Sequence, residues 1–175
     1  FKLKIIKWIF FHPTIGKGYS DDFLKKGEVF QCCIVAMEKE FSTPRIENVR
    51  DVFLFSCNTG LAYADVEKLT ADNIIKGIDG SLWIKIKRTK TKSLSSIPLL
   101  PIAQKLIEKY EGVENSKGTL LPVYSNQRMN SYLKEIAERC DIKKNLTFHV
   151  TRHTFSTTLP HVSYTNLTLP DLNHS

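Results

Sequence analysis

The residues best suited to chemistry stand near the end of the chain, in the segment TFHVTRHTFSTT at 147–158. His149 and Arg152 are three positions apart, so on a helix their side chains share one face. Thr147 is the expected N-cap, and it puts His149 at the helix N-terminus, where backbone N–H groups favour an anion. An imidazole donor beside a guanidinium fork suits a phosphate group. A surface arginine beside a capping histidine fits the same pattern.

A further cation is expected at the tip of a hairpin. The segment KRTKTKSLSSIPL at 87–99 contains Lys90, whose flexible side chain can act as a general acid toward a leaving oxygen. The remaining basic residues are predicted to contact DNA phosphates, and a solvated charged face is the alternative. These DNA-binding candidates are Lys85, Lys87, Arg88 and Lys92 from the hairpin and His153 from the last helix.

Neither histidines nor cysteines form a metal-binding pattern. His149 and His153 are four positions apart, but no glutamate stands between them and no third ligand is evident. The four cysteines include no CxxC pair and do not suggest a disulfide framework, which favours reduced thiols in a cytoplasmic protein. We therefore expect no metal and no other cofactor. No apolar run is long enough to span a membrane.

The charge balance favours a polyanionic partner. The chain carries 25 Lys and Arg against 18 Asp and Glu, a formal net charge of +7. Cations placed near phosphates release counterions, so this excess suits nucleic acid, although a solvated basic surface also fits. With 42% hydrophobic residues, the composition is that of a globular domain with a core.

The expected elements are mostly helical. One helix begins at the N-cap Ser42, has Pro44 in its first turn, is apolar nearly all round, and ends at Gly60. A short helix follows in 61–70, and the change to alternation in 73–88 predicts a hairpin with its turn at Asp79–Gly80. Later elements are a polar loop at 89–96, a strand at 96–100, and helices at 101–110, at 126–140 and from 147. The fold class is therefore α+β, predominantly helical, with a small antiparallel sheet.

Three segments of the chain resemble the tyrosine recombinase (phage integrase) family. They are TGLAYADVEKLTADNI at 59–74, IPL at 97–99 after the basic hairpin, and HVTRHTFSTT at 149–158. The resemblance spans about residues 50–158 and implies the fold of that family's catalytic domain. It also implies DNA cleavage through a covalent phosphotyrosine bond followed by strand transfer, without metal or ATP. The implied partners are double-stranded DNA and other protomers of the recombinase.

The resemblance also assigns roles to residues. It makes Arg152 a phosphate clamp, and it gives His149 a hydrogen bond to the scissile phosphate and a part in proton transfer. Lys90, eight residues before Pro98, falls where the family's hairpin lysine falls. Ala62 stands where the family usually has its first catalytic arginine. Arg50 in the preceding helix is a candidate substitute.

The nucleophile is the part of the pattern that the chain does not supply. The family continues with an apolar helix, an LGH-type segment and the tyrosine, whereas residues 159–175 show none of these and Tyr164 lacks the expected flanks. We predict that the chain, as it stands, lacks the nucleophile and is inactive. The predicted domains are a poorly specified N-terminal segment at 1–36, a partial catalytic domain at 37–158, and an atypical tail at 159–175. The first of these is interpreted as the end of a core-binding domain with a linker.

Three other functions compete with a recombinase. A non-catalytic DNA-binding module accounts for the charge and the helices, but not for the joint spacing of Lys90, His149 and Arg152. A type IB topoisomerase relative would share the phosphotyrosine chemistry, and a helical interaction protein would need none of it. The recombinase assignment requires those three residues to converge in space, and the integrase-like wording of TGLAYADV and HTFSTT disfavours the topoisomerase.

Overall fold

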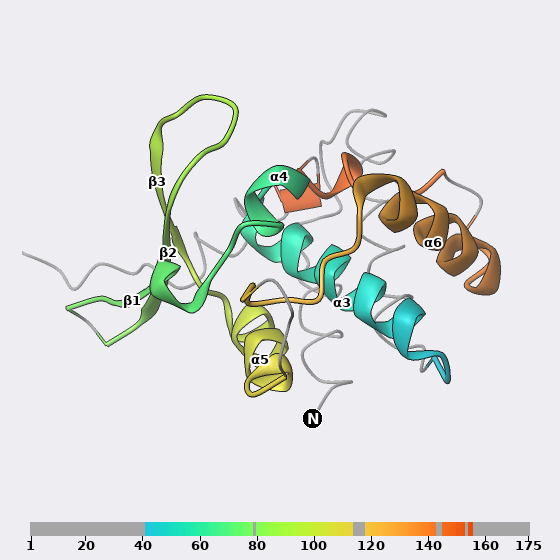
Figure 1. The fold of residues 1–175 in the computed structure, drawn as a ribbon, viewed down its shortest axis with the longest axis horizontal. Helices are drawn as coiled ribbons and strands as arrows, with labels where there is room; N and C mark the ends of the chain where they lie inside the picture. Colours follow the sequence, from blue (N-terminus) through green and yellow to red (C-terminus); the bar gives the residue numbers. More distant parts are fainter. Residues whose placement is uncertain (1–40, 79, 114–117, 143–144, 153, 156–175) are drawn as a thin grey trace, which may run out of the picture.

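The computed structural model describes residues 41–78, 80–113, 118–142, 145–152 and 154–155, and helices dominate it (Figure 1). The elements in chain order are α3 (Pro44–Thr59), α4 (Tyr63–Val66), the 3₁₀ helix η2 (Ala71–Asn73), β1 (Ile74–Lys76), β2 (Leu82–Lys87), β3 (Leu94–Pro98), α5 (Pro101–Tyr110) and α6 (Asn126–Arg139). Residues 150–152 and 154–155 are helical again. The strands form one antiparallel sheet in the order β1-β2-β3, which confirms the predicted α+β class.

Helix α3 is the centre of the molecule. It begins at Pro44, whose fixed φ suits the first helical position, and it ends at Gly60, which adopts a left-handed conformation with a φ of 65°. The N-cap is Thr43, one residue later than predicted, and Thr43 makes no side-chain capping bond. The proline rather than a capping hydroxyl therefore sets the start of the helix, which explains why the prediction of Ser42 was wrong.

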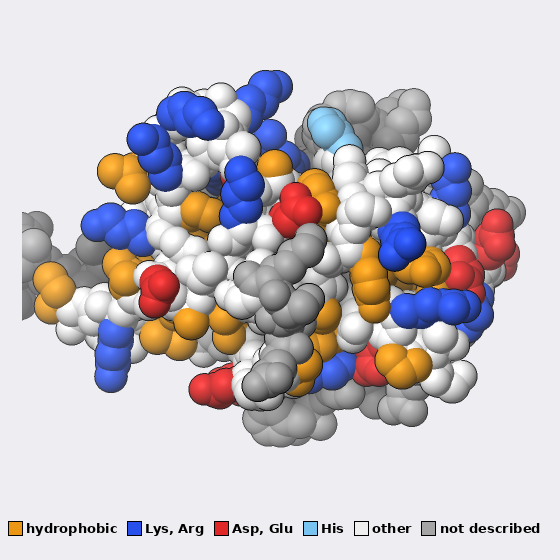
Figure 2. All heavy atoms as spheres, viewed as in Figure 1, with side chains coloured by type: hydrophobic (Ala, Val, Ile, Leu, Met, Phe, Trp, Pro, Cys, Tyr) orange, Lys and Arg blue, Asp and Glu red, His pale blue; other side chains and the backbone are white. Residues whose placement is uncertain are grey.

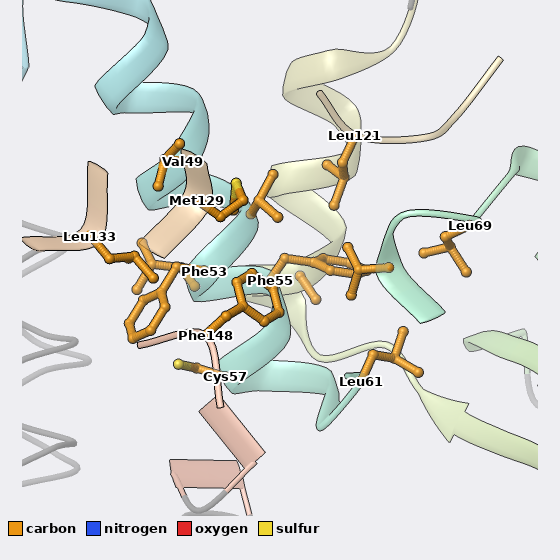
Figure 3. Close-up of a cluster of buried hydrophobic side chains, with 14 of the residues drawn as sticks. Val49, Phe53, Phe55, Cys57, Leu61, Leu69, Leu121, Met129, Leu133 and Phe148 are labelled. Atoms are coloured by element: carbon orange, nitrogen blue, oxygen red, sulfur yellow. The ribbon is translucent and has the colours of Figure 1, made fainter. Parts of the chain in front are cut away.

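The hydrophobic core surrounds α3, as its all-round apolar pattern predicted (Figure 3). Helices α5 and α6 pack against it, and no side chain of the predicted α6 stripe is more than 6% exposed. The buried residues of α3 and α6 include Val49, Phe53, Phe55, Met129, Leu133, Ile136 and Ala137. Full burial of such side chains contributes roughly 1.5–3 kcal/mol each, so α3 is fixed in position and can serve as a platform for the segments at its ends.

Helix α5 has the predicted bounds but turns a different set of side chains inward. Ala103 and Tyr110 are the buried residues, while Leu106 and Ile107 are partly buried against the core. Ile102, predicted to point inward, is only of intermediate exposure. Ala103 has a small side chain, which suits a position where α5 packs against α3. Tyr110 can be buried because its hydroxyl group donates a hydrogen bond to Asp51.

The sheet confirms the predicted alternation on β2. Ile84 pairs with Ile74 on one side and Ile97 on the other, and this inner face is buried. Strand β3, however, begins at Leu94, two residues before the predicted start, because the ladder continues through Lys87 opposite Leu94. The polar residues at this end form backbone pairs while remaining near solvent, so their composition was mistaken for a loop.

The loop that joins β2 to β3 is consequently short. The Arg88 N–H donates to the Ser93 carbonyl at 2.8 Å, and the Lys92 N–H donates to the Arg88 carbonyl at 2.9 Å. Lys92 closes the turn with a φ of 58°, a conformation that side chains rarely adopt. The hairpin tip therefore has a defined backbone path. Among the described residues, no helix is long and apolar enough to cross a membrane.

The C-terminal end of α3 leads to a testable prediction about Gly60. A Cβ atom added there would overlap the Phe155 ring, and the left-handed backbone would also be strained. We expect Gly60→Ala to lower the free energy of unfolding by roughly 2–5 kcal/mol, through backbone strain and overpacking together. Denaturant unfolding followed by circular dichroism measures this change.

Gly112→Ala is the matched control, because Gly112 has a φ of 77° but nothing within 4 Å of an added Cβ. This substitution should lower the free energy of unfolding only through backbone strain, by about 1–2 kcal/mol. Equal destabilisation by the two variants would show that the contact between Gly60 and Phe155 is not tight.

Candidate functional site

The β2–β3 hairpin is tied at its base to α4. The Thr89 N–H donates to Asp65 Oδ1 at 2.8 Å, and the Thr89 hydroxyl donates to the Ala64 carbonyl at 3.3 Å. Asp65 is only 3% exposed, so its carboxylate is shielded from water and its hydrogen bond with the Thr89 N–H is stronger than a surface one. The short α4 therefore fixes where the hairpin tip begins.

Alternation along β2 divides the basic residues between two faces of the sheet. Lys85 and Lys87 are exposed on the outer face, while Ile86 points inward and is buried. Arg88 follows the same alternation, and its side chain lies on the inner side, half-buried. Of the predicted DNA contacts on this hairpin, Arg88 thus occupies a different place from Lys85 and Lys87.

The Arg88 guanidinium is held by oxygens from three elements. Its Nε–H donates to Ser95 Oγ on β3 at 3.1 Å, and Nη1–H donates to the Gly60 carbonyl at 3.3 Å. Nη1 also lies 3.9 Å from Asp65 Oδ2, within ion-pair range. The hairpin arginine is therefore joined to the segment after α3, where Ala62 is the N-cap of α4.

The segment with His149 and Arg152 is anchored by the residue before it. Phe148 is buried, its ring meets Tyr63 edge to face at 5.7 Å, and its N–H donates to Asn130 Oδ1 at 2.8 Å. His149 lies in the turn that leads into the helix, and Arg152 lies one turn later. Both are exposed, so a buried aromatic ring holds a backbone that turns two polar side chains toward solvent.

These segments converge on one open pocket with a volume of about 530 Å³, here called the hairpin pocket. Its lining comes from the end of α3, the β2–β3 hairpin and the last described helix: Gly60, Arg88, Thr91, Ser93, Ser95, His149, Arg152 and Phe155. Lys and Arg side chains gather over the hairpin end of the molecule, next to α4 (Figures 1 and 2). The pocket combines positive charge, an imidazole and several hydroxyl groups, which suits a phosphate.

The structure brings some of the predicted site residues together. His149 and Arg152 line the hairpin pocket, and Arg88 joins them. Lys90 is exposed at the hairpin tip between the anchored Thr89 and the pocket-lining Thr91, but it is not itself a lining residue. Lys92 is exposed at the same tip. His153 lies outside the described residues, as does Tyr164.

Arg50 lies in a different environment. Its Nε–H donates to Asp51 Oδ1 at 2.8 Å, Nη2 pairs with Glu47 at 3.3 Å, and the guanidinium lies over the Phe41 ring. Lys109 from α5 reaches Glu47 and Asp51 at 2.6 Å each. Arg50 is not among the residues that line the hairpin pocket. The contacts named above lie within α3, with Glu47 and Asp51, and on the ring of Phe41, which precedes that helix.

Glu47, Arg50, Asp51, Lys109 and Tyr110 form a network that we call the α3–α5 charge cluster. Burial and the nearby Asp51 carboxylate, which accepts from the Tyr110 hydroxyl at 2.9 Å, raise the pKa of Tyr110 above its ordinary value. Burial opposes the charge of Lys109, but Asp51 and Glu47 outweigh this and raise the pKa of Lys109. Near α4, burial and Glu67 raise the pKa of Tyr63 to about 12.

The sequence did not lead us to predict the hydroxyl groups that line the hairpin pocket. Thr91, Ser93 and Ser95 were assigned to a polar loop, although strand alternation carried through Arg88 would have placed Ser95 on the same face as that arginine. Gly60 was predicted only as the end of a helix, and Phe155 was identified only within the HVTRHTFSTT motif, so neither was expected to line a pocket. In the described part of the chain, no group of three or more His, Cys, Asp or Glu is arranged to hold a metal ion.

Comparisons with known proteins identify the family and the fold of this chain. A family model described as "Phage integrase family" matches residues 33–164. The chain therefore belongs to the phage integrase family of tyrosine recombinases, and the described fold is that of their catalytic domain. A comparison with curated proteins gave no match.

Solved recombinase structures share this fold. XerH site-specific recombinase bound to its difH substrate, a pre-cleavage complex, aligns with a TM-score of 0.57 and 17% identity over 83% of this chain and 44% of that one. Its post-cleavage complex with palindromic difH aligns with a TM-score of 0.57 and 17% identity, over 83% of this chain and 42% of that one. XerA recombinase aligns with a TM-score of 0.53 and 17% identity, over 82% of this chain and 50% of that one. The chain thus spans half or less of the length of these proteins.

The α3–α5 charge cluster predicts a loss of stability in alkali. Because the pKa of Tyr110 is raised in the folded state, the unfolded chain loses this proton first, from about pH 10, while the folded chain keeps it. The unfolded state then binds fewer protons, so the free energy of unfolding falls as pH rises. We expect this decline to begin near pH 10 and to be shallower for Tyr110→Phe.

Urea unfolding at intervals from pH 8 to pH 12 measures both slopes. Tyr63→Phe should flatten the decline in the same way, because the pKa of Tyr63 is also raised. Parallel curves for wild type and Tyr110→Phe would contradict the proposed protonation of Tyr110.

Proposed function

We propose that this chain is the catalytic part of a site-specific DNA recombinase that cleaves duplex DNA through a phosphotyrosine intermediate and then transfers the strand. One observation carries the proposal: Arg88, His149 and Arg152, from two distant segments, line a single open pocket. A pocket with two guanidinium groups, an imidazole and hydroxyl donors is complementary to one phosphodiester. The resemblance to recombinase motifs in the same segments supports this reading.

The pocket residues would act on charge that develops during the reaction. A phosphodiester under in-line attack gathers negative charge on its non-bridging oxygens, and fixed cations lower that barrier. Arg152 would clamp these oxygens with its fork, and His149 would hydrogen-bond the phosphate and assist proton transfer. Both side chains extend from a backbone fixed by Phe148, so little reorganisation is needed when DNA binds.

We assign to Arg88, rather than to Arg50, the cationic role that an arginine at the position of Ala62 would have. Arg88 lines the hairpin pocket and bonds the Gly60 carbonyl, two residues before Ala62. Arg50 instead pairs with Glu47 and Asp51. An arginine that reaches the site from the hairpin would therefore compensate for the small residue after TGL.

Lys90 would supply the proton to the leaving oxygen. It stands at the tip of a hairpin whose base is bonded to α4 through Thr89, and the next residue, Thr91, lines the pocket. A lysine at such a tip can follow the DNA backbone and reach the leaving group. Lys85, Lys87 and Lys92 would bind phosphates that flank the cleaved bond. Other protomers of the recombinase would bind the same DNA.

The nucleophile would come from outside the described residues. The hairpin pocket has no tyrosine among its described lining residues. The Tyr63 and Tyr110 hydroxyls donate to the Tyr124 carbonyl and to Asp51, so they serve the fold. The expectation that Tyr164 is not the nucleophile stays a prediction. Attack by a tyrosine would retain the energy of the DNA bond in the covalent intermediate.

Covalent capture tests the proposed activity. The full-length recombinase would be incubated with a pool of nicked, partly randomised duplexes that release a short strand on cleavage and so trap the intermediate. We expect a protein–DNA adduct that survives denaturation, with the DNA joined to a tyrosine when peptides are sequenced by mass spectrometry. The enriched duplexes would then be tested for strand transfer.

Two results would overturn the proposed activity. Tight duplex binding without any adduct would identify a non-catalytic DNA-binding module. An adduct that relaxes supercoiled DNA but never transfers a strand to a second duplex would identify topoisomerase chemistry instead.

Substitution of Arg88 gives the sharpest residue-level prediction. Loss of one fixed charge-stabilising donor costs about 10²- to 10³-fold in rate, so we expect Arg88→Ala to reduce adduct formation by that factor. Arg50→Ala should lower the thermal midpoint instead, because it leaves the buried Asp51 with one partner fewer. Single-turnover cleavage and thermal unfolding, measured side by side, separate these effects.

Lys105→Ala is the control for the loss of one positive charge, because Lys105 is exposed on α5 and does not line the pocket. It should cleave at the wild-type rate. If Arg50→Ala abolished cleavage without unfolding the protein while Arg88→Ala did not, the assignment of Arg88 would be wrong.

A further inference from the structure

We propose that Ser95 is a positioning residue that aims the Arg88 guanidinium into the hairpin pocket. This inference rests on the proposed role of Arg88 and extends it to a residue that contacts the arginine from the next strand. Ser95 lines the same pocket, and its hydroxyl oxygen accepts from Arg88 Nε–H at 3.1 Å.

The register of the hairpin brings the two residues together. Ser95 pairs with Ile86, and the Arg88 N–H bonds the Ser93 carbonyl, so Arg88 and Ser95 are diagonal neighbours on the inner face. A serine at this place is short enough to leave room for the arginine above it. Ser96, the next residue on β3, is exposed, and strand alternation puts its side chain on the opposite face.

The Ser95 bond is the shorter of two hydrogen bonds that orient the guanidinium. The arginine side chain has many rotamers and its fork is planar, so a hydrogen bond at Nε together with one at Nη1 restricts the plane of the whole group. Nη1 lies 3.3 Å from the Gly60 carbonyl and 3.9 Å from Asp65 Oδ2, both longer than the contact with Ser95.

Asp65 cannot replace Ser95 in this role. Its Oδ1 already accepts from the Thr89 N–H at 2.8 Å, and its Oδ2 stands beyond hydrogen-bond distance from Arg88. Asp65 therefore supplies charge to retain the arginine, and Ser95 supplies direction. In the described part of the chain, Nη2 has no recorded hydrogen-bond partner, and it is the atom left to meet a phosphate oxygen.

The test compares Ser95→Ala, Ser95→Thr and Ser96→Ala in single-turnover cleavage by the full-length recombinase. We expect Ser95→Ala to slow cleavage about 10-fold, the scale of one lost hydrogen bond to a charged group, while duplex affinity stays within about 2-fold. Ser95→Thr keeps the acceptor oxygen and should restore most of the rate. Ser96→Ala is the matched control and should match wild type.

A double variant decides whether Ser95 acts through Arg88. If it does, Ser95→Ala adds no further loss in the Arg88→Ala background, since the contact is already gone. Independent losses that multiply would overturn the positioning role. So would a Ser95→Ala enzyme that cleaves as fast as the Ser96→Ala control.

The outcomes also separate this inference from the proposed function. If Arg88→Ala cleaves normally, the role of Arg88 fails and the positioning role fails with it. If Arg88→Ala is slow but Ser95→Ala is not, only the positioning role fails. Proton–nitrogen NMR of arginine side chains provides a check that does not depend on activity. The Arg88 Nε–H signal should exchange faster with water in Ser95→Ala, and it should keep its wild-type rate in Ser95→Thr.

Discussion

The buried carboxylate of Asp65 is the constraint on which the site depends. One oxygen accepts the Thr89 N–H, and the other faces the Arg88 guanidinium. A carboxylate that is 3% exposed needs such partners, because an unpaired buried charge is costly. The requirement to satisfy Asp65 therefore draws the hairpin onto α4, and the position of the hairpin determines which of its side chains face the pocket.

The rest of the site follows from attachment to the core. Helix α3 is buried along most of its length and ends at Gly60, where the backbone turns directly beside the Phe155 ring. Phe148 enters the same core and holds the turn that carries His149. The polar groups of the pocket thus extend from backbone that apolar packing has already placed. A pocket assembled in this way is preorganised for charge, and that is the main source of electrostatic catalysis.

Much of the fold could be predicted from the periodic spacing of apolar residues and from the glycine and proline residues that limit the helices. Gly60 and Pro101 marked helix limits correctly, and the apolar stripe of α6 was identified residue by residue. The errors arose where tertiary contacts override composition: the polar start of β3 is a strand because β2 lies beside it. In the site, the spacing of His149 and Arg152 was sufficient to group them. Alternation carried one residue past Lys87 would have placed Arg88 on the inner face, but Arg88 was grouped with the other basic residues of the hairpin. Its approach to Asp65, which is remote in sequence, could not be predicted from a local pattern.

The two faces of the hairpin have different surroundings. On β2, Lys85 and Lys87 are exposed to solvent, and Arg88, directly after β2, lines the pocket. Because side chains alternate along a strand, adding or deleting a single residue here would exchange the faces. The bulky Ile86 would be turned toward water and a lysine toward the core. A substitution on the outward face therefore leaves the buried face in register, whereas a change in the length of this strand requires a compensating bulge.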